Sequence, residues 1–148
     1  MQVFLPLSDL QSSVQTLDIK RLGKQIVECS QILRTLAGRS DGWKNHPVVK
    51  AWRGHEPVLL QYAYFANQEW IVRRHDSHGA WVNLDNDDVV LDEWITADPK
   101  APPWYTEKLA ERYRQHLLSK DEEYYRKRGF NEEPRQIEST EWSELFQL

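Results

Sequence analysis

Three cations and one carboxylate lie close together on a helix that the sequence predicts for residues 18–37. Its apolar residues recur at steps of three and four and form one stripe, made of Ile19, Leu22, Ile26, Cys29, Leu33 and Leu36. The charged group faces away from that stripe and comprises Lys20, Arg21, Lys24 and Glu28. A helix of this kind can hold a phosphate backbone and place an acid beside it.

Glu28 has two possible roles at this stage. It follows Lys24 by four residues and Lys20 by eight, so the three side chains share one face. An ordinary surface ion pair, worth about 0.2–0.5 kcal/mol, is the interpretation that periodicity alone favours. The functional alternative is a carboxylate beside a phosphate site, available for proton transfer. Gly23, in mid-helix, costs about 1 kcal/mol relative to Ala and indicates the close approach of another group.

Other polar clusters have simple explanations when each is taken alone. Arg114, His116 and Lys120 form a small basic group that fits a solvated helix face. The run Asn45-His46-Pro47 either caps a helix or points into a cleft, and Arg53 begins a polar turn. The pair His75 and His78 has no cysteine pair or further ligand at metal spacing. The sequence also lacks a glycine-rich phosphate loop, a nucleophile elbow and an HExxH motif, so we expect no metal and no cofactor.

The composition suits a single domain over residues 1–148, with a net charge of −4. Residues 1–60 carry 8 Lys and Arg against 5 Asp and Glu, whereas residues 61–100 carry 3 against 8, so a basic face on an acidic protein is possible. A lone cysteine on the apolar stripe, with no signal peptide or transmembrane segment apparent, predicts a cytoplasmic protein. Most of the seven Trp suit a core, and a few are available to stack on bases.

Capping residues and periodicity predict an all-α fold, a compact helical bundle with irregular loops and an extended C-terminal tail. We expect a short helix after Ser8 or Asp9, the basic helix ending at Gly38, and a brief helix from Pro47 to about Gly54. A long helix from Pro57 to about Arg74 is apolar around much of its circumference, which predicts the most buried helix of the domain. The remaining expected elements are one turn at 91–94, a helix over 106–119, its continuation over 122–128, and a polar tail over 129–148.

The order of the motifs in the first 60 residues resembles the pyrimidine-dimer DNA glycosylase family of the phage endonuclease V type, most closely its bacterial branch. Leu17-Asp18-x-Lys20-Arg21-Leu22 leads at a fixed distance to Glu28, and Gly42-Trp43-Lys44-Asn45-His46-Pro47 follows one helix later. The resemblance implies a helical repair enzyme that extrudes a nucleotide of double-stranded DNA and cuts its glycosidic bond. In that family the N-terminal α-amine attacks the sugar C1′, and the resulting Schiff base permits strand cleavage.

The resemblance places these roles on particular residues of this chain. The amine of Met1 would be the nucleophile, because Gln2 is too bulky for ready removal of the methionine, and an α-amine with a pKa of about 8 is partly unprotonated at neutral pH. Glu28 matches the assisting glutamate, and His46 matches the Asn-His-Pro element. The family usually has Arg where this chain has Val27, and Lys24 is the candidate to compensate. The expected DNA contacts are Gln2, Lys20, Arg21, Lys24, Asn45, Arg53, Arg114 and Lys120.

Three hypotheses therefore stand. The leading one is a glycosylase acting on a damaged or modified base, with possible AP-lyase activity. The second is a non-catalytic DNA-binding relative, and the third is a protein-interaction module that uses a Trp-rich surface. The amine mechanism requires Met1, Glu28 and His46 to converge on one cleft.

Overall fold

The computed structural model describes residues 1–74 and 92–148, and every regular element in these ranges is a helix. This confirms the all-α fold class. The α-helices in chain order are α1 (Leu10–Thr16), α2 (Ile19–Leu36), α3 (Pro47–Trp52), α4 (Glu56–Arg74), α5 (Asp92–Thr96), α6 (Glu107–Lys120), α7 (Glu122–Lys127) and α8 (Trp142–Leu145), and a short 3₁₀ helix, η2 (Ser139–Glu141), precedes α8. None of the helices in the described ranges has the length and apolar character needed to span a membrane.

Local capping interactions explain where the helices begin and end. The Asp9 side chain accepts a hydrogen bond from the Ser12 N–H at 2.7 Å at the start of α1, and Thr106 caps α6 through the Leu109 N–H at 3.3 Å. Gly38 ends α2 with a φ of +77°, a conformation that glycine adopts without strain. The predicted helix boundaries are therefore confirmed within one or two residues.

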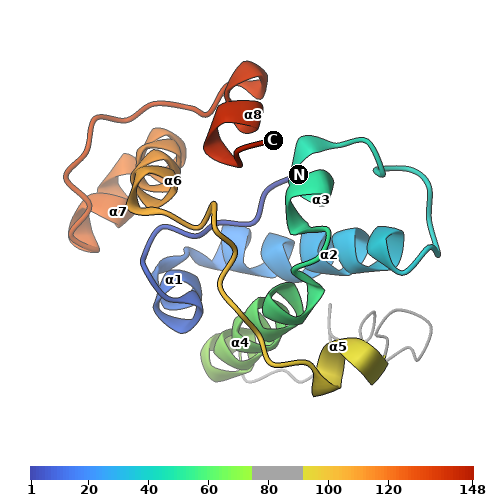
Figure 1. The fold of residues 1–148 in the computed structure, drawn as a ribbon. Coiled ribbons are helices and arrows are strands. Elements are labelled where there is room, and N and C mark those ends of the chain that lie inside the picture. Colours follow the sequence, from blue (N-terminus) through green and yellow to red (C-terminus); the bar gives the residue numbers. More distant parts are fainter. Residues whose placement is uncertain (75–91) are drawn as a thin grey trace.

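Helices α1, α2 and α4 pack together in the lower part of Figure 1, and α2 crosses α4 closely. Gly23 explains the closeness of this crossing. A Cβ atom added at Gly23 would lie 2.7 Å from Cζ3 of Trp70, which is closer than carbon atoms can approach. The close approach predicted at Gly23 is therefore confirmed, and the approaching group is the Trp70 indole.

The prediction that the helix from Pro57 to Arg74 is the most buried is wrong. Nine side chains of α2 are buried, against six of α4. On α4, Tyr64 is 49% exposed and Val72 is 67% exposed. The error arises because α4 carries apolar side chains around its circumference, whereas α2 also buries polar ones, which hydropathy does not reveal.

The C-terminal segment differs from the expected extended tail. It runs back along the molecule and ends in α8 near α3, as Figure 1 shows in orange and red. The Phe146 ring packs at 4.9 Å, between ring centroids, against Trp104, which in turn contacts Trp52 of α3 at the same distance. Arg112 of α6 binds the Glu141 carboxylate through Nε and Nη2 and donates to the Gln136 carbonyl oxygen. Aromatic burial and this buried arginine therefore hold the tail in place.

Two features noted in the sequence lie outside the described residues. They are the His75 and His78 pair, and the acidic run at Asp85, Asp87 and Asp88. The expected turn at 91–94 corresponds to α5, whose Trp94 is buried.

Candidate active site

The N-terminal segment is extended, and its backbone forms hydrogen bonds with a side chain of α2 rather than with a neighbouring strand. Gln25 is fully buried, and its Oε1 accepts a hydrogen bond from the Phe4 N–H at 2.8 Å. Its Nε2 donates to the Gln2 carbonyl oxygen at 3.1 Å. The Tyr62 hydroxyl, also buried, lies 2.8 Å from both the Phe4 carbonyl oxygen and Gln25 Oε1, and its single proton is donated to one of these two acceptors. These contacts satisfy backbone groups that would otherwise be buried without partners, and they fix the path of residues 2–4.

Glu28 lies one helical turn beyond Gln25 and is 6% exposed. Its Oε2 accepts hydrogen bonds from the backbone N–H of Gln2 at 3.1 Å and from Gln25 Nε2 at 3.3 Å. Its Oε1 lies 3.8 Å from Lys24 Nζ. The surface ion pair that periodicity favoured is therefore an incomplete description, because the carboxylate is buried against the N-terminal segment.

A cavity of about 360 Å³ opens beside this carboxylate. The N-terminal segment, α2 and α6 form its walls. Four of its lining side chains are cationic, and Glu28 is the single carboxylate among them. The complete lining is Met1, Gln2, Phe4, Lys20, Arg21, Lys24, Glu28, His116 and Lys120. A cationic cavity of this size suits a nucleotide with its phosphates.

The cations of the cavity differ in how much of their charge is available. Arg21 is bound to Asp18, at 3.0 Å between Nη1 and Oδ2, and Asp18 also accepts a hydrogen bond from the Tyr125 hydroxyl. In the part of the chain that the structure describes, no carboxylate pairs with Lys20 or Lys120. These two lysines therefore carry the uncompensated positive charge of the cavity.

His46 lies on the other side of the N-terminus, at the start of α3. Its Nδ1 accepts a hydrogen bond from the Val48 N–H at 3.1 Å, so the ring caps the helix. Burial lowers the pKa of His46, and the positive charge of the Met1 α-amine lowers it further. This electrostatic contact agrees with Figure 1, in which the N-terminus lies beside α3. The structure thus brings Met1 and Glu28 to one cavity and the amine near enough to His46 to affect its pKa, although His46 is not part of the cavity lining.

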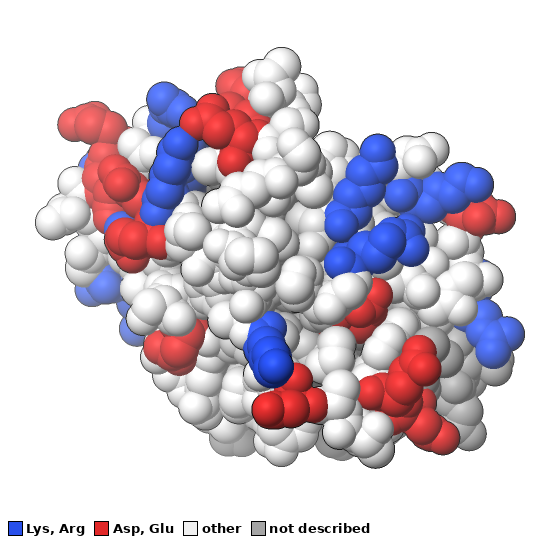
Figure 2. All heavy atoms as spheres, viewed as in Figure 1, with Lys and Arg blue, Asp and Glu red and all other residues white. Residues whose placement is uncertain are grey.

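The remaining expected DNA contacts do not line the cavity. Asn45 and Arg53 are exposed at the two ends of α3, where Figure 2 shows basic side chains gathered over α3 and the preceding loop. Arg114 has a structural role instead. Its guanidinium binds the Glu107 and Glu132 carboxylates and donates to the Pro6 carbonyl oxygen at 2.9 Å, which anchors the N-terminal segment to α6.

Three residues of this site were not identified from the sequence. Gln25 and Tyr62 hold the N-terminal segment, and His116 was assigned to a solvated face although it is 6% exposed. The spacing does indicate that His116 is buried, because it follows the buried Tyr113 by three residues and the buried Leu109 by seven and so lies on the same helix face. Likewise, Gln25 follows Leu22 by three, so it lies next to the apolar stripe.

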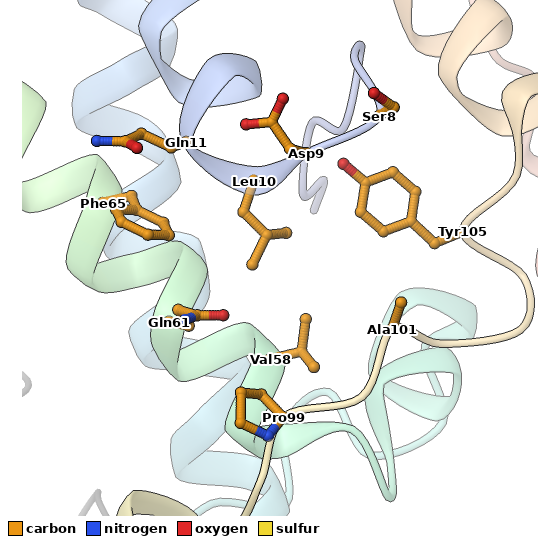
Figure 3. A pocket seen from close by; sticks show the side chains of 10 residues that line it. All are labelled: Ser8, Asp9, Leu10, Gln11, Val58, Gln61, Phe65, Pro99, Ala101 and Tyr105. Carbon is orange, nitrogen blue, oxygen red and sulfur yellow. The ribbon is translucent and has the colours of Figure 1, made fainter.

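A second cavity, of about 410 Å³, lies between α1, α4 and the segment before α6 (Figure 3). Leu10 of α1 and Val58 of α4 extend into it, and Tyr105 closes one side. No Lys or Arg is among its lining residues, and its single carboxylate, Asp9, already caps α1. This cavity therefore lacks the charge that a phosphate site needs.

The fold and the cavity together describe an all-helical protein with a cationic pocket suited to an anionic ligand. The sequence model of the pyrimidine dimer DNA glycosylase family matches residues 1–83, which is more than half of the chain, so the protein belongs to this DNA-repair family. The matched region includes α1 to α4 and Glu28, whereas Lys120 and His116 lie beyond it. Searches of curated proteins and of solved structures gave no significant match.

Proposed function

We propose that the protein excises a damaged or modified base from double-stranded DNA and then cleaves the strand, using the Met1 α-amine as nucleophile. One observation carries the proposal. The Glu28 carboxylate accepts a hydrogen bond from the N–H of Gln2, the residue next to the amine, inside a cavity lined by four cations. A buried acid beside an amine, at a phosphate-binding cavity, is the combination that this chemistry needs.

The proposed reaction has two stages. The unprotonated Met1 amine attacks the sugar C1′, the bond from C1′ to the base nitrogen breaks, and the base leaves with the bonding electron pair and takes up a proton. The nitrogen of the adduct loses one proton, the bond from C1′ to the ring oxygen O4′ breaks, O4′ keeps the electron pair and takes up a proton, and an iminium ion joins the Met1 nitrogen to C1′. Loss of a proton from C2′ then gives an enamine, whose electron pair breaks the bond from C3′ to oxygen and expels the 3′ phosphate, which cleaves the strand. We assign the proton transfers near C1′ in both stages to Glu28, because its buried carboxylate contacts Gln2 and lines the cavity.

The neutral state of His46 supports the same mechanism. A lowered pKa keeps the imidazole uncharged at neutral pH, so the ring does not repel a substrate-bound iminium ion. Since Nδ1 is occupied by the Val48 N–H, the ring proton is on Nε2, which becomes a donor toward DNA. We assign phosphate binding to Lys20, Lys24 and Lys120, with Arg21 as a weaker contributor, and leave Gln2, Asn45 and Arg53 as further DNA contacts.

A non-catalytic DNA-binding relative is the second candidate. Val27, which stands where the family usually has Arg, favours it, because a cation next to the glutamate is missing there. The structure offers Lys24 in its place, 3.8 Å from Glu28. The interaction-module hypothesis has less support among the described residues, since Trp52, Trp94, Trp104 and Trp142 are buried in the core and Trp43 is the Trp that is 47% exposed.

Borohydride trapping tests the proposal. A duplex with one abasic site is incubated with the protein and sodium borohydride, which reduces an imine to a stable amine linkage. We expect a covalent protein–DNA adduct, with the modified peptide containing Met1 by mass spectrometry. Protein with a chemically acetylated α-amine is the control and should give no adduct. Salt-sensitive binding without any adduct would instead support the non-catalytic relative.

A further inference from the structure

His116 lines the same cavity from α6, yet the mechanism above does not use it. Its ring stacks on Phe4, with centroids 5.8 Å apart and ring planes 28° apart. This contact fixes the imidazole plane against the N-terminal segment, so the ring has a defined orientation in the cavity wall.

The hydrogen bonds of His116 determine which ring nitrogen carries the proton. Nδ1 accepts from the Ile137 N–H at 3.0 Å. Burial, together with the positive charges of Lys120, Arg112 and Arg21, lowers the pKa of His116 to about 4, against the weaker opposite effect of Glu141. The ring is therefore neutral at physiological pH, and its proton is on Nε2.

Nε2 is available to a ligand. It has no acceptor among the described residues, and it is not one of the buried side-chain atoms that lack both a partner and solvent contact. A neutral donor adds little to the attraction for phosphate that the surrounding lysines already provide. The N–H donor adds selectivity instead, because it can bind an acceptor oxygen but not an amino group at the same place.

We propose that His116 is a specificity-determining residue whose Nε2–H donates a hydrogen bond to a carbonyl oxygen of the base that enters the cavity. This inference rests on the proposed function. Pyrimidine bases present such carbonyl oxygens on their edge. A phosphate oxygen could also accept this hydrogen bond, and the experiment below separates the two acceptors.

A pair of variants separates the donor from the structural role. In His116→Asn, Oδ1 takes the place of Nδ1 and keeps the Ile137 hydrogen bond, but the Nε2 donor is lost. In His116→Gln, the side-chain amide takes the place of Nε2, so the donor is kept and the Ile137 bond is lost. Thermal unfolding should therefore show a lower Tm for His116→Gln than for His116→Asn.

Cleavage is measured on one duplex with a thymine dimer and on one with an abasic site, which has no base to read. On the dimer we expect kcat/KM to fall about 3- to 10-fold for His116→Asn and to stay near the wild-type value for His116→Gln. On the abasic duplex, His116→Asn should lose less activity than it loses on the dimer, because no base carbonyl oxygen is there to accept the hydrogen bond.

Several results would overturn the inference. If His116→Asn lowers kcat/KM equally on the two duplexes, the hydrogen bond goes to a phosphate. If His116→Asn leaves kcat/KM on the dimer unchanged, the donor role is excluded. The donor role is also excluded if His116→Gln loses as much activity on the dimer as His116→Asn does. A wild-type protein that does not cleave the dimer duplex also overturns the inference about His116. If that protein still cleaves the abasic duplex, the proposed function survives. If it neither cleaves the abasic duplex nor gives a trapped adduct, both proposals fall.

Discussion

The Glu28 carboxylate and the backbone N–H of Gln2 lie 3.1 Å apart, across 26 positions of the chain. This hydrogen bond joins the middle of α2 to the residue that follows the N-terminal amine. Met1 and Glu28 line the same cavity, which is part of the convergence that the amine mechanism requires, whereas His46 lies outside the cavity lining.

Replacing Glu28 with Gln tests the role of this acid. Gln keeps the size and an acceptor for the Gln2 N–H but cannot move a proton, so we expect cleavage of abasic and lesion DNA to fall about 10²- to 10⁴-fold. DNA affinity should hold or increase, because a negative charge is removed near phosphate. Single-turnover cleavage and fluorescence anisotropy measure the two effects. Retained cleavage would exclude Glu28 from the chemistry.

Gln25 should prove essential for holding the N-terminal segment. Gln25→Met keeps the side-chain length and removes every hydrogen bond to Gln2, Phe4 and Tyr62. Buried groups left without partners cost about 1–3 kcal/mol each, so we expect the free energy of unfolding to fall by at least about 2 kcal/mol. Urea denaturation measures this.

The matched control for this change is Gln31→Met. Gln31 is an exposed glutamine on the same helix, so its replacement should alter stability by less than about 0.5 kcal/mol. Equal effects of the two changes would show that the buried amide does not hold the segment.

The helices were predictable because the signals for their ends are local. Asp9, Thr106 and Gly38 act through atoms within a few residues, so their types alone set where helices begin and end. The residue types and order around Glu28 also indicated the family, which the comparison confirmed.

The burial of the site was not predictable from local patterns. Periodicity gives the angular position of Glu28 and Gln25 on α2, but not which distant segment covers that position. The covering segment is residues 2–4, which carry no helical signal and are held through long-range side-chain contacts. His116 was misassigned for the same reason, since residues from the C-terminal segment cover it.

Gly23 and Trp70 should show coupled effects on stability. In Gly23→Ala, the new methyl group must displace the indole, at about 1–3 kcal/mol, while the helix propensity of Ala returns about 1 kcal/mol. We therefore expect a net loss of up to about 2 kcal/mol. In a Trp70→Ala background, the same substitution should stabilise the protein by up to about 1 kcal/mol. A double-mutant cycle from denaturant unfolding measures this coupling, and additive effects would contradict the close contact.

His116 should make the protein less stable in acid. Its pKa is about 4 in the folded protein against an ordinary value of 6.5, so between these values the unfolded chain binds more protons than the folded one. The free energy of unfolding should therefore fall as the pH drops from about 6.5 to about 4. His116→Asn removes this contribution, and the variant should lose less stability than the wild type between about pH 7 and about pH 5. Parallel pH profiles would contradict the assignment.

Lys20 and Lys120 should account for part of the salt dependence of DNA binding. If each contacts a phosphate, alanine at either position should lower the slope of log affinity against log salt by about 0.9 and weaken binding to lesion and undamaged duplexes alike. Lys108→Ala is the control, because Lys108 pairs with Glu144 and lies on the same helix as Lys120, about 18 Å away. Anisotropy titrations over a range of salt concentrations give the slopes. If Lys108→Ala changes the slope as much as Lys120→Ala, the DNA follows the whole length of α6, and the cavity lysines are not its principal phosphate contacts.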